Sequence, residues 1–190
     1  AASLNPAGLV NVGTQITTSS SFLNLRGGFT STGTGGAVAD GRHMSEKDWL
    51  YIPNFAANWR VNWGFADAVA LTAYGNGGVL TRYGDMTSTA CNTPFGVFPA
   101  GTGVYCRGVL GVNMQQNFLS VAFAKQLSPS LSIGVAPILA RQTVEVDGVS
   151  LFSFQSVNGA NFSNRGTDTA WGGGVRGGVE WQAMPGVKFG

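Results

Sequence analysis

The chain has 190 residues, of which 44% are hydrophobic and 11% are charged, and its formal net charge at pH 7 is +2. Soluble domains carry about 25% charged residues, so this composition indicates a surface that faces, in part, something other than water. The small net charge and the lack of any Lys/Arg run argue against a nucleic-acid-binding protein. No apolar run approaches 18 residues, which excludes a membrane-spanning helix and leaves a closed β-barrel as the way to cross a membrane.

The first residues form a polar turn, Asn5-Pro6-Ala7-Gly8, set among small apolar residues. An Asn before Pro is extended and Pro fixes the next φ, so a plain turn is one interpretation. The segment lacks the basic and apolar regions of a signal peptide. We expect residues 1–13 to be a segment that the rest of the chain surrounds.

Apolar and polar residues then alternate with a period of two, which predicts antiparallel strands rather than helices. The abundance of Gly, Thr, Asn and Val also lowers helix propensity along the chain. Short turns and long connections alternate, as at the two ends of an outer-membrane barrel. The predicted strands are 21–30, 49–63, 65–74, 112–125, 131–144 and 170–182, with the start of a seventh at 186–190; the long loops lie near 31–48, 75–107 and 145–168.

Two pairs of tryptophans give a geometric check on this interpretation. Trp49 and Trp59 are ten residues apart on one face of a predicted strand, and so are Trp171 and Trp181. Ten residues span roughly 33 Å of strand, or about 25 Å along the axis of a barrel whose strands are tilted near 40°. This length matches the apolar band between the aromatic girdles of an outer-membrane barrel. The sequence therefore predicts an all-β, antiparallel transmembrane barrel within residues 14–190.

Two cysteines, Cys91 and Cys106, lie in the second long loop. Two thiols and the distant His43 make a poor zinc site, so a disulfide that pins the loop is favoured. A disulfide indicates an oxidising compartment, the periplasm or the cell exterior. We expect no metal and no cofactor.

A G-x-G-x-x-G pattern occurs at Gly172, Gly174 and Gly177. A dinucleotide-binding loop needs a strand to end and a helix to begin there. The period-two alternation instead runs straight through, from Trp171 to Trp181, so we interpret these as strand glycines.

A further cluster of reactive residue types, Asp40, His43 and Ser45, lies in the first long loop. Outer-membrane hydrolases use such residues, but the chain has no second histidine for acid–base work. A solvated loop is the favoured interpretation, and we expect no enzymatic activity. An enzyme that depends on His43 remains an alternative.

Several stretches, taken in order, resemble the FadL family of outer-membrane transporters for long-chain fatty acids and hydrocarbons. "NPAGL" followed by "GTQIT" resembles the family's N-terminal hatch, the segment that plugs the barrel, and the strand that follows it. Residues 52–84, 111–149 and 165–181 resemble its second to sixth strands. The family has about 14 strands, so the six or seven predicted here imply the N-terminal half of a longer barrel.

The resemblance implies a function, a site and a location. It implies passive diffusion of a hydrophobic molecule through a hatch-plugged barrel, with lateral release at the kinked third strand, here Phe65–Tyr74. The hatch motif is Asn5, Pro6 and Ala7. It implies a Gram-negative outer membrane, contact with its lipid and lipopolysaccharide, and a monomer when full length. A structural or adhesive barrel remains a further alternative, whereas the lumen has too few charges for a water-filled porin.

Two groups of residues are candidates for contact with the substrate. Apolar residues in the long loops either pack on one another or form a groove that captures hydrophobic molecules. Arginines predicted to face the lumen either bind a carboxylate headgroup or pair with interior acids such as Glu180. The loop candidates are Phe95, Phe98, Leu151, Phe152 and Phe154, and the arginines are Arg26, Arg60 and Arg176.

Overall fold

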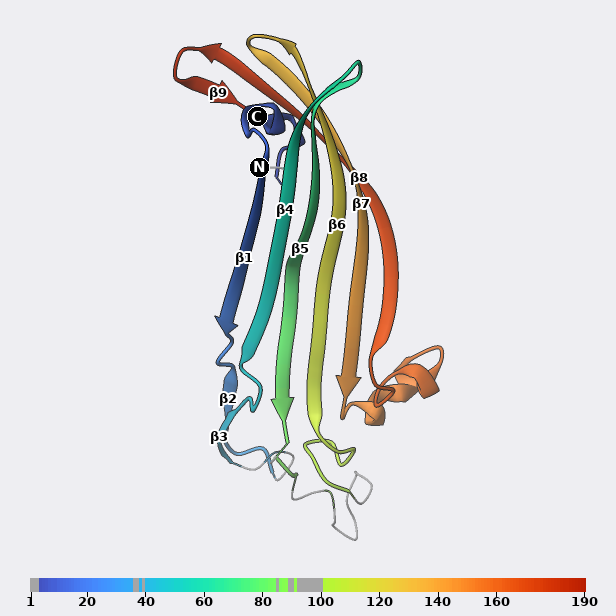
Figure 1. The fold of residues 1–190 in the computed structure, drawn as a ribbon. Helices are drawn as coiled ribbons and strands as arrows, with labels where there is room; N and C mark the ends of the chain where they lie inside the picture. Colours follow the sequence, from blue (N-terminus) through green and yellow to red (C-terminus); the bar gives the residue numbers. More distant parts are fainter. Residues whose placement is uncertain (1–3, 36–37, 39, 85, 89–90, 92–100) are drawn as a thin grey trace.

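The main feature of the computed structural model is one seven-stranded antiparallel sheet, curled into a half-barrel (Figure 1). The structure describes residues 4–35, 38, 40–84, 86–88, 91 and 101–190. Its strands, in the spatial order β1-β4-β5-β6-β7-β8-β9, are β1 (Gln15–Asn24), β4 (Trp49–Trp63), β5 (Ala66–Tyr83), β6 (Leu110–Ser128), β7 (Leu131–Asp147), β8 (Asp168–Met184) and β9 (Val187–Phe189). The prediction of an antiparallel all-β fold is confirmed.

Three short 3₁₀ helices and a small hairpin complete the described structure. The helices are η1 (Pro6–Asn11), η3 (Ser150–Gln155) and η4 (Gly159–Asn161), and the hairpin pairs β2 (Gly28–Ser31) with β3 (Gly41–Met44). Among the described residues, no helix combines the length and the apolar content needed to cross a membrane.

The two faces of the sheet differ in side-chain size because successive strand residues point to opposite faces. On β8, Trp171 and Trp181 lie on the convex face and are 64% and 50% exposed. The concave face of the same strand carries Arg176, Gly178 and Glu180. Large apolar side chains therefore gather on the outside of the curl.

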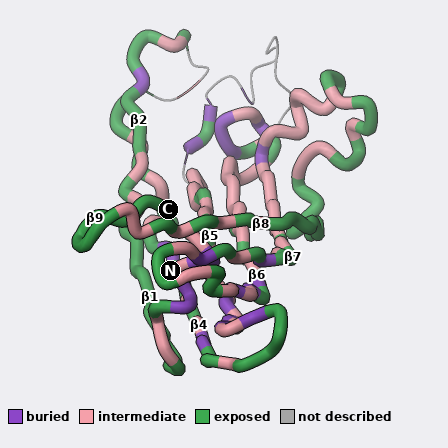
Figure 2. The backbone as a smooth tube through the Cα atoms, turned by 90° about the horizontal axis from the view of Figure 1, so that it is seen from above, coloured by how far each residue is buried: buried purple, intermediate pink, exposed green. Residues whose placement is uncertain are grey.

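Small residues line the inside of the curl, where η1 packs. Figure 2 shows buried backbone, in purple, close to the N-terminus, where this contact lies. Leu9 and Val10 of η1 contact a patch of fully buried alanines contributed by three neighbouring strands. The patch consists of Ala68 and Ala70 on β5, Ala122 and Ala124 on β6, and Ala136 on β7. Side chains no larger than methyl allow η1 to approach the wall closely enough to exclude water from this contact.

The predicted first strand was placed wrongly. The structure has β1 at Gln15–Asn24, six residues before the expected start, and Gly28–Ser31 belongs to the separate hairpin. The polar run Thr17–Ser21 has no apolar alternation to mark it as a strand. It is a strand because it pairs with β4 along ten residues, and pairing partners are not visible in local sequence.

The second long loop is shorter than expected because β5 continues to Tyr83. Its register on β6 shifts between Gly75 and Gly77, so Asn76 is an extra residue in a β-bulge. The bulge moves the later residues to the opposite face, which is why the alternation in the sequence breaks at Gly75. The predicted loop near 31–48 contains the strand β3 (Gly41–Met44), and the predicted loop near 145–168 begins inside β7, which continues to Asp147.

The disulfide between Cys91 and Cys106 joins two segments of the loop that follows β5, with 5.3 Å between the Cα atoms. Both residues are buried. Their bond lies outside the seven-stranded sheet, so it ties the loop and does not hold the strands together.

We predict that the unfolded but unreduced protein exposes no thiol. A maleimide added in denaturant should modify neither cysteine, and should modify both after reduction, as read by intact-mass spectrometry. The double variant Cys91→Ser/Cys106→Ser should keep its far-UV β-sheet spectrum, because the bond lies outside the sheet. Loss of that spectrum would contradict the assignment of the disulfide to the loop alone.

Candidate functional site: the inside of the half-barrel

The η1 segment is shaped by its own first residues. Pro6 occupies the start of the helix, where its missing N–H is not needed. Asn5 caps it, because its Oδ1 accepts a hydrogen bond from Ala7 N at 3.0 Å. Asn5 Nδ2 also donates to Val179 O of β8 at 2.9 Å. One side chain therefore shapes the turn and ties it to the wall.

Two glycines in the wall admit the backbone of this turn. A Cβ at Gly134 on β7 would lie 2.5 Å from Ala7 N, and one at Gly178 on β8 would lie 2.1 Å from Asn5 Oδ1. These two glycines are register partners on adjacent strands. Together they form a recess into which Asn5 and Pro6 fit, and any larger residue would displace them.

Hydrogen bonds from the wall continue along η1. Ser132 Oγ donates to Ala7 O at 3.1 Å, and an Arg60 Nη donates to Val10 O at 3.3 Å. Asn58 Nδ2 donates to Gly13 O. Arg60 therefore binds a backbone carbonyl of this segment through its guanidinium.

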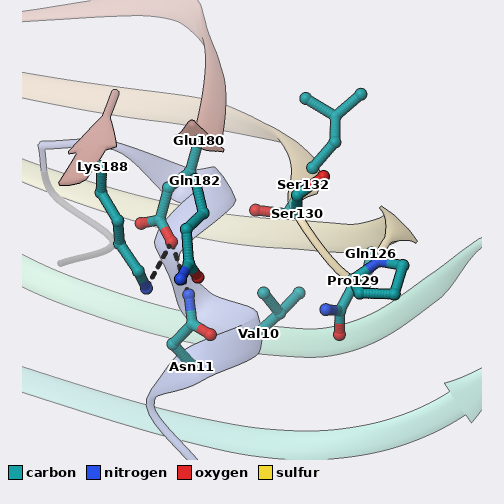
Figure 3. A pocket seen from close by; sticks show the side chains of 10 residues that line it. Val10, Asn11, Gln126, Pro129, Ser130, Ser132, Glu180, Gln182 and Lys188 are labelled. Carbon is teal, nitrogen blue, oxygen red and sulfur yellow. Dashed lines mark hydrogen bonds and ion pairs between the residues drawn. The ribbon is translucent and has the colours of Figure 1, made fainter. Parts of the chain in front are cut away.

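A small polar pocket lies at the C-terminal end of η1 (Figure 3). Glu180 of β8 accepts a hydrogen bond from Asn11 at 2.6 Å and pairs with Lys188 of β9 at 3.3 Å. The pocket has a volume of about 20 Å³, which suits a single water molecule. The sequence offered Glu180 as an ion-pair partner of the predicted lumen arginines. In the structure Glu180 instead contacts Lys188 and Asn11.

Two of the larger cavities lie on the concave face, toward the long loops from η1. One of about 490 Å³ runs from Leu4 past Asn54 and Thr72 to Gly75. The other, of about 230 Å³, is lined by side chains that include Gln116, Phe118 and Gln142.

Tyr74 lies between these cavities. It lines the larger one, and its ring packs at a tilt against Phe118 of the smaller one with 5.5 Å between centroids. An Arg176 Nη donates to the Tyr74 hydroxyl at 3.4 Å. An aromatic pair and a guanidinium thus lie together on the concave face, a combination that suits an amphiphilic molecule.

The sheet separates between β4 and β5 at the end of the long loops. Their described register ends at the pair Asn54–Tyr74, so the residues of β4 before Asn54 have no partner on β5. Pro53, the next residue, has no N–H to continue the ladder. The two ribbons diverge from this point toward the loops in Figure 1. We call this stretch, β4 residues 49–53 and β5 residues 75–81, the seam.

Side chains rather than backbone hydrogen bonds fill the seam. A Cβ at Gly75 would lie 2.4 Å from Ile52 Cγ2, and one at Gly78 would lie 2.9 Å from a Leu50 Cδ atom. Leu50 is 5% exposed. Two aliphatic side chains therefore cover two glycines of the bulged strand.

The outer end of the seam is closed by the residues that follow β3. Glu46 N donates to Arg82 O at 2.8 Å, and Arg82 N donates to Ser45 Oγ at 3.0 Å. The Arg82 guanidinium pairs with Glu46 at 3.1 Å. Ser45 and Glu46 thus take the place beside β5 that β4 leaves vacant.

The structure places the other predicted site residues as follows. Arg26 lies between β1 and β2, exposed and bonded to Asn24 at 2.9 Å, rather than on a strand. Phe152 of η3 packs edge-on against Tyr105 with 5.1 Å between ring centroids, while Phe154 is 79% exposed. Leu151 is half-buried in the same helix, and Phe95 and Phe98 lie outside the described residues.

In the described part of the first loop, Asp40, His43 and Ser45 have different hydrogen-bond partners. His43 Nε2 lies 3.2 Å from Ser31 Oγ, and Asp40 accepts a hydrogen bond from Gly33 N. Ser45 is engaged by Arg82. Across the part of the chain that the structure describes, no cluster of His, Cys, Asp or Glu is suited to hold a metal ion.

Sequence reasoning missed most partners of the predicted motif. Gly134 and Gly178 gave no signal, because strand glycines are common in this chain and their partner is more than 120 residues away. Tyr74 and Phe118 looked like ordinary strand aromatics. The break in alternation at Gly75 was visible, but it indicated the start of a loop rather than a bulge.

No family model matches the chain, and no curated protein is similar enough in sequence to count as a relative. The resemblance to the FadL family therefore stays a prediction from the motifs.

We predict that Gly178→Ala releases η1 from the wall, whereas Gly174→Ala does not. Both glycines lie on the concave face of β8, but a Cβ at Gly174 would meet nothing within 4 Å. Overpacking of this kind costs about 1–3 kcal/mol, so amides within residues 4–13 should exchange roughly tenfold faster or more. Hydrogen–deuterium exchange with mass spectrometry measures the effect. Equal exchange in the two variants would show that the recess does not hold η1.

Proposed function

We propose that this chain forms part of an outer-membrane barrel that carries hydrophobic molecules, long-chain fatty acids or hydrocarbons, by passive diffusion. In this proposal η1 belongs to a hatch that plugs the lumen, and the seam is where the molecule leaves sideways into the bilayer. The edges at β1 and β9 would be paired by further strands of the same barrel, since open edges are not tolerated in lipid. The observation that carries the proposal is the seam beside a cavity of about 490 Å³.

The distribution of side chains supports a membrane location. The convex face carries large exposed apolar side chains on β4, β6, β7 and β8, and the concave face carries alanines, glycines and polar residues where η1 packs. A soluble half-barrel would expose these aromatics to water at a cost of about 1.5–3 kcal/mol each. Lipid removes this cost.

The seam supports lateral release. Backbone groups without ladder partners are costly in lipid, so a break in the ladder is expected only where the wall borders water or substrate. The cavity that includes Leu4 and Thr72 reaches Gly75 at the edge of this break. A molecule in this cavity would thus have a short path from the lumen to the seam.

Release would require the hatch to move, and the contacts of η1 suit a movable plug. Its apolar contacts are with methyl groups. Its polar contacts are separate hydrogen bonds, some donated by Ser132, Asn58 and Arg60 of the wall. The others are donated by Asn5 to Val179 O and by Asn11 to Glu180. Each such bond between neutral groups contributes about 0.5–1.5 kcal/mol. Arg176 beside Tyr74 is the candidate for a carboxylate headgroup in the lumen, and Arg26 in the loops is a candidate for first capture.

The first test deletes the hatch motif. Cells that express the complete protein should take up a labelled long-chain fatty acid or alkane, and deletion of Asn5–Ala7 should change the uptake rate because η1 loses its cap and its anchor on Val179. Uptake of the two labels and assembly in the outer membrane are measured in parallel. With the barrel assembled, uptake of neither label would contradict the proposal and favour an adhesive barrel or an enzyme that depends on His43.

The second test locks the seam. A Cβ at position 75 would lie 3.6 Å from Ile52 Cβ, within the range of about 3.5–4.5 Å seen in disulfides. We predict that Ile52→Cys/Gly75→Cys forms a cross-link between β4 and β5 when oxidised, and that uptake falls in the oxidised form and recovers on reduction.

The control for the seam test is the protein without the two substitutions under the same oxidant and reductant, since it contains the Cys91–Cys106 disulfide. The single variants Ile52→Cys and Gly75→Cys control for the substitutions themselves. Undiminished uptake through a fully cross-linked seam would place the exit elsewhere in the barrel.

A further inference from the structure

A row of three exposed residues crosses the convex face where its apolar part ends. Asn117 of β6 pairs with Arg141 of β7, and Arg141 pairs with Trp171 of β8. The Arg141 guanidinium carbon lies 5.9 Å from the centre of the Trp171 ring. A cation, an amide and an indole N–H are thus presented side by side on three adjacent strands.

The residues on the turn side of this row are apolar. The next convex row consists of Leu119, Leu139 and Gly173, and the two leucines are 45% and 47% exposed. Gly173 leaves the space between Trp171 and Val175 on β8 without a side chain. This strip can accept an extended acyl chain beneath the ring of Trp171.

The residues on the loop side of the row are polar. The next convex row consists of Gln115, Thr143 and Thr169, whose amide and hydroxyl groups can bond to sugar hydroxyls. Arg141 therefore lies at the boundary between an apolar strip and a hydrogen-bonding strip, the position of a lipid headgroup.

The positive charge of Arg141 favours a lipid with an anionic headgroup. Arg141 is exposed, and no ion pair among the described residues includes it. Glu145, the nearest acid along the convex positions of β7, accepts a hydrogen bond from Thr167 at 3.3 Å. A guanidinium at the edge of an apolar surface is stabilised by a phosphate, which it binds through charge-assisted hydrogen bonds.

We propose that Arg141, Asn117 and Trp171 form a binding site for a phosphorylated glycolipid of the outer leaflet. The phosphate would meet Arg141 and Asn117, the sugars the row with Thr143, and an acyl chain the strip with Leu139 and Gly173. This inference rests on the outer-membrane location proposed above, but it does not depend on what the barrel transports.

The test measures lipid binding to the complete protein in detergent by native mass spectrometry. The probes are lipid A with its phosphates, the same lipid after enzymatic dephosphorylation, and inorganic phosphate. Arg141→Gln should weaken binding of the phosphorylated lipid roughly tenfold or more, and Arg141→Lys by less. Arg165→Gln removes an equal charge from the exposed loop before β8 and should leave binding unchanged.

Three results would overturn the proposal. They are equal binding by the Arg141→Gln and Arg165→Gln variants, equal binding of the phosphorylated and dephosphorylated lipids, and inorganic phosphate that displaces the lipid completely at equal concentration. Migration of the folded barrel on unheated gels confirms that each variant is assembled. Uptake measured on the same variants separates the two proposals, because loss of lipid binding with normal uptake concerns this site alone.

Discussion

The close approach of the η1 backbone to β7 and β8 is the contact on which the interior of this half-barrel depends. A 3₁₀ segment of six residues is not stable alone, so the wall must supply its partners. Gly134 and Gly178 give the turn room, and Asn5 joins the turn to the wall. The alanines of β5 to β7 follow from the same requirement, because any longer side chain would hold η1 away from the sheet.

The arrangement of residue sizes also explains the composition. A sheet that packs on a core puts its large apolar residues inside, whereas this one puts most of them on the convex face and meets η1 on the concave face with methyl groups and glycine. High hydrophobic content with few charges then follows without a conventional core. The apolar cluster of the described strands is the small contact with η1, so a sheet of this kind relies on its ladders and on the medium around it.

The sequence predicted the strands that have one apolar face. It missed the strand segments that are defined only by backbone pairing with a neighbouring strand. The strand 49–63 was predicted with its observed bounds, since its aromatics alternate strictly. The polar strand β1 and the part of β5 beyond Gly75 were missed, because pairing and a bulge decide them. The Asn5 motif was recognised locally, but its recess at Gly178 depends on the register between β7 and β8, which no local pattern contains.

The extra residue Asn76 divides β5 into two parts, and alternate residues that face the interior have even numbers in the first part and odd numbers in the second. Before it, the even positions from Ala68 to Tyr74 face the interior, and after it the odd positions from Gly77 to Tyr83 do. The convex positions, which have room for a bulky apolar residue, are therefore odd-numbered before the bulge and even-numbered after it. A homologue that lost or gained one residue there would turn every later side chain inside out, so length at this point is under stronger constraint than identity.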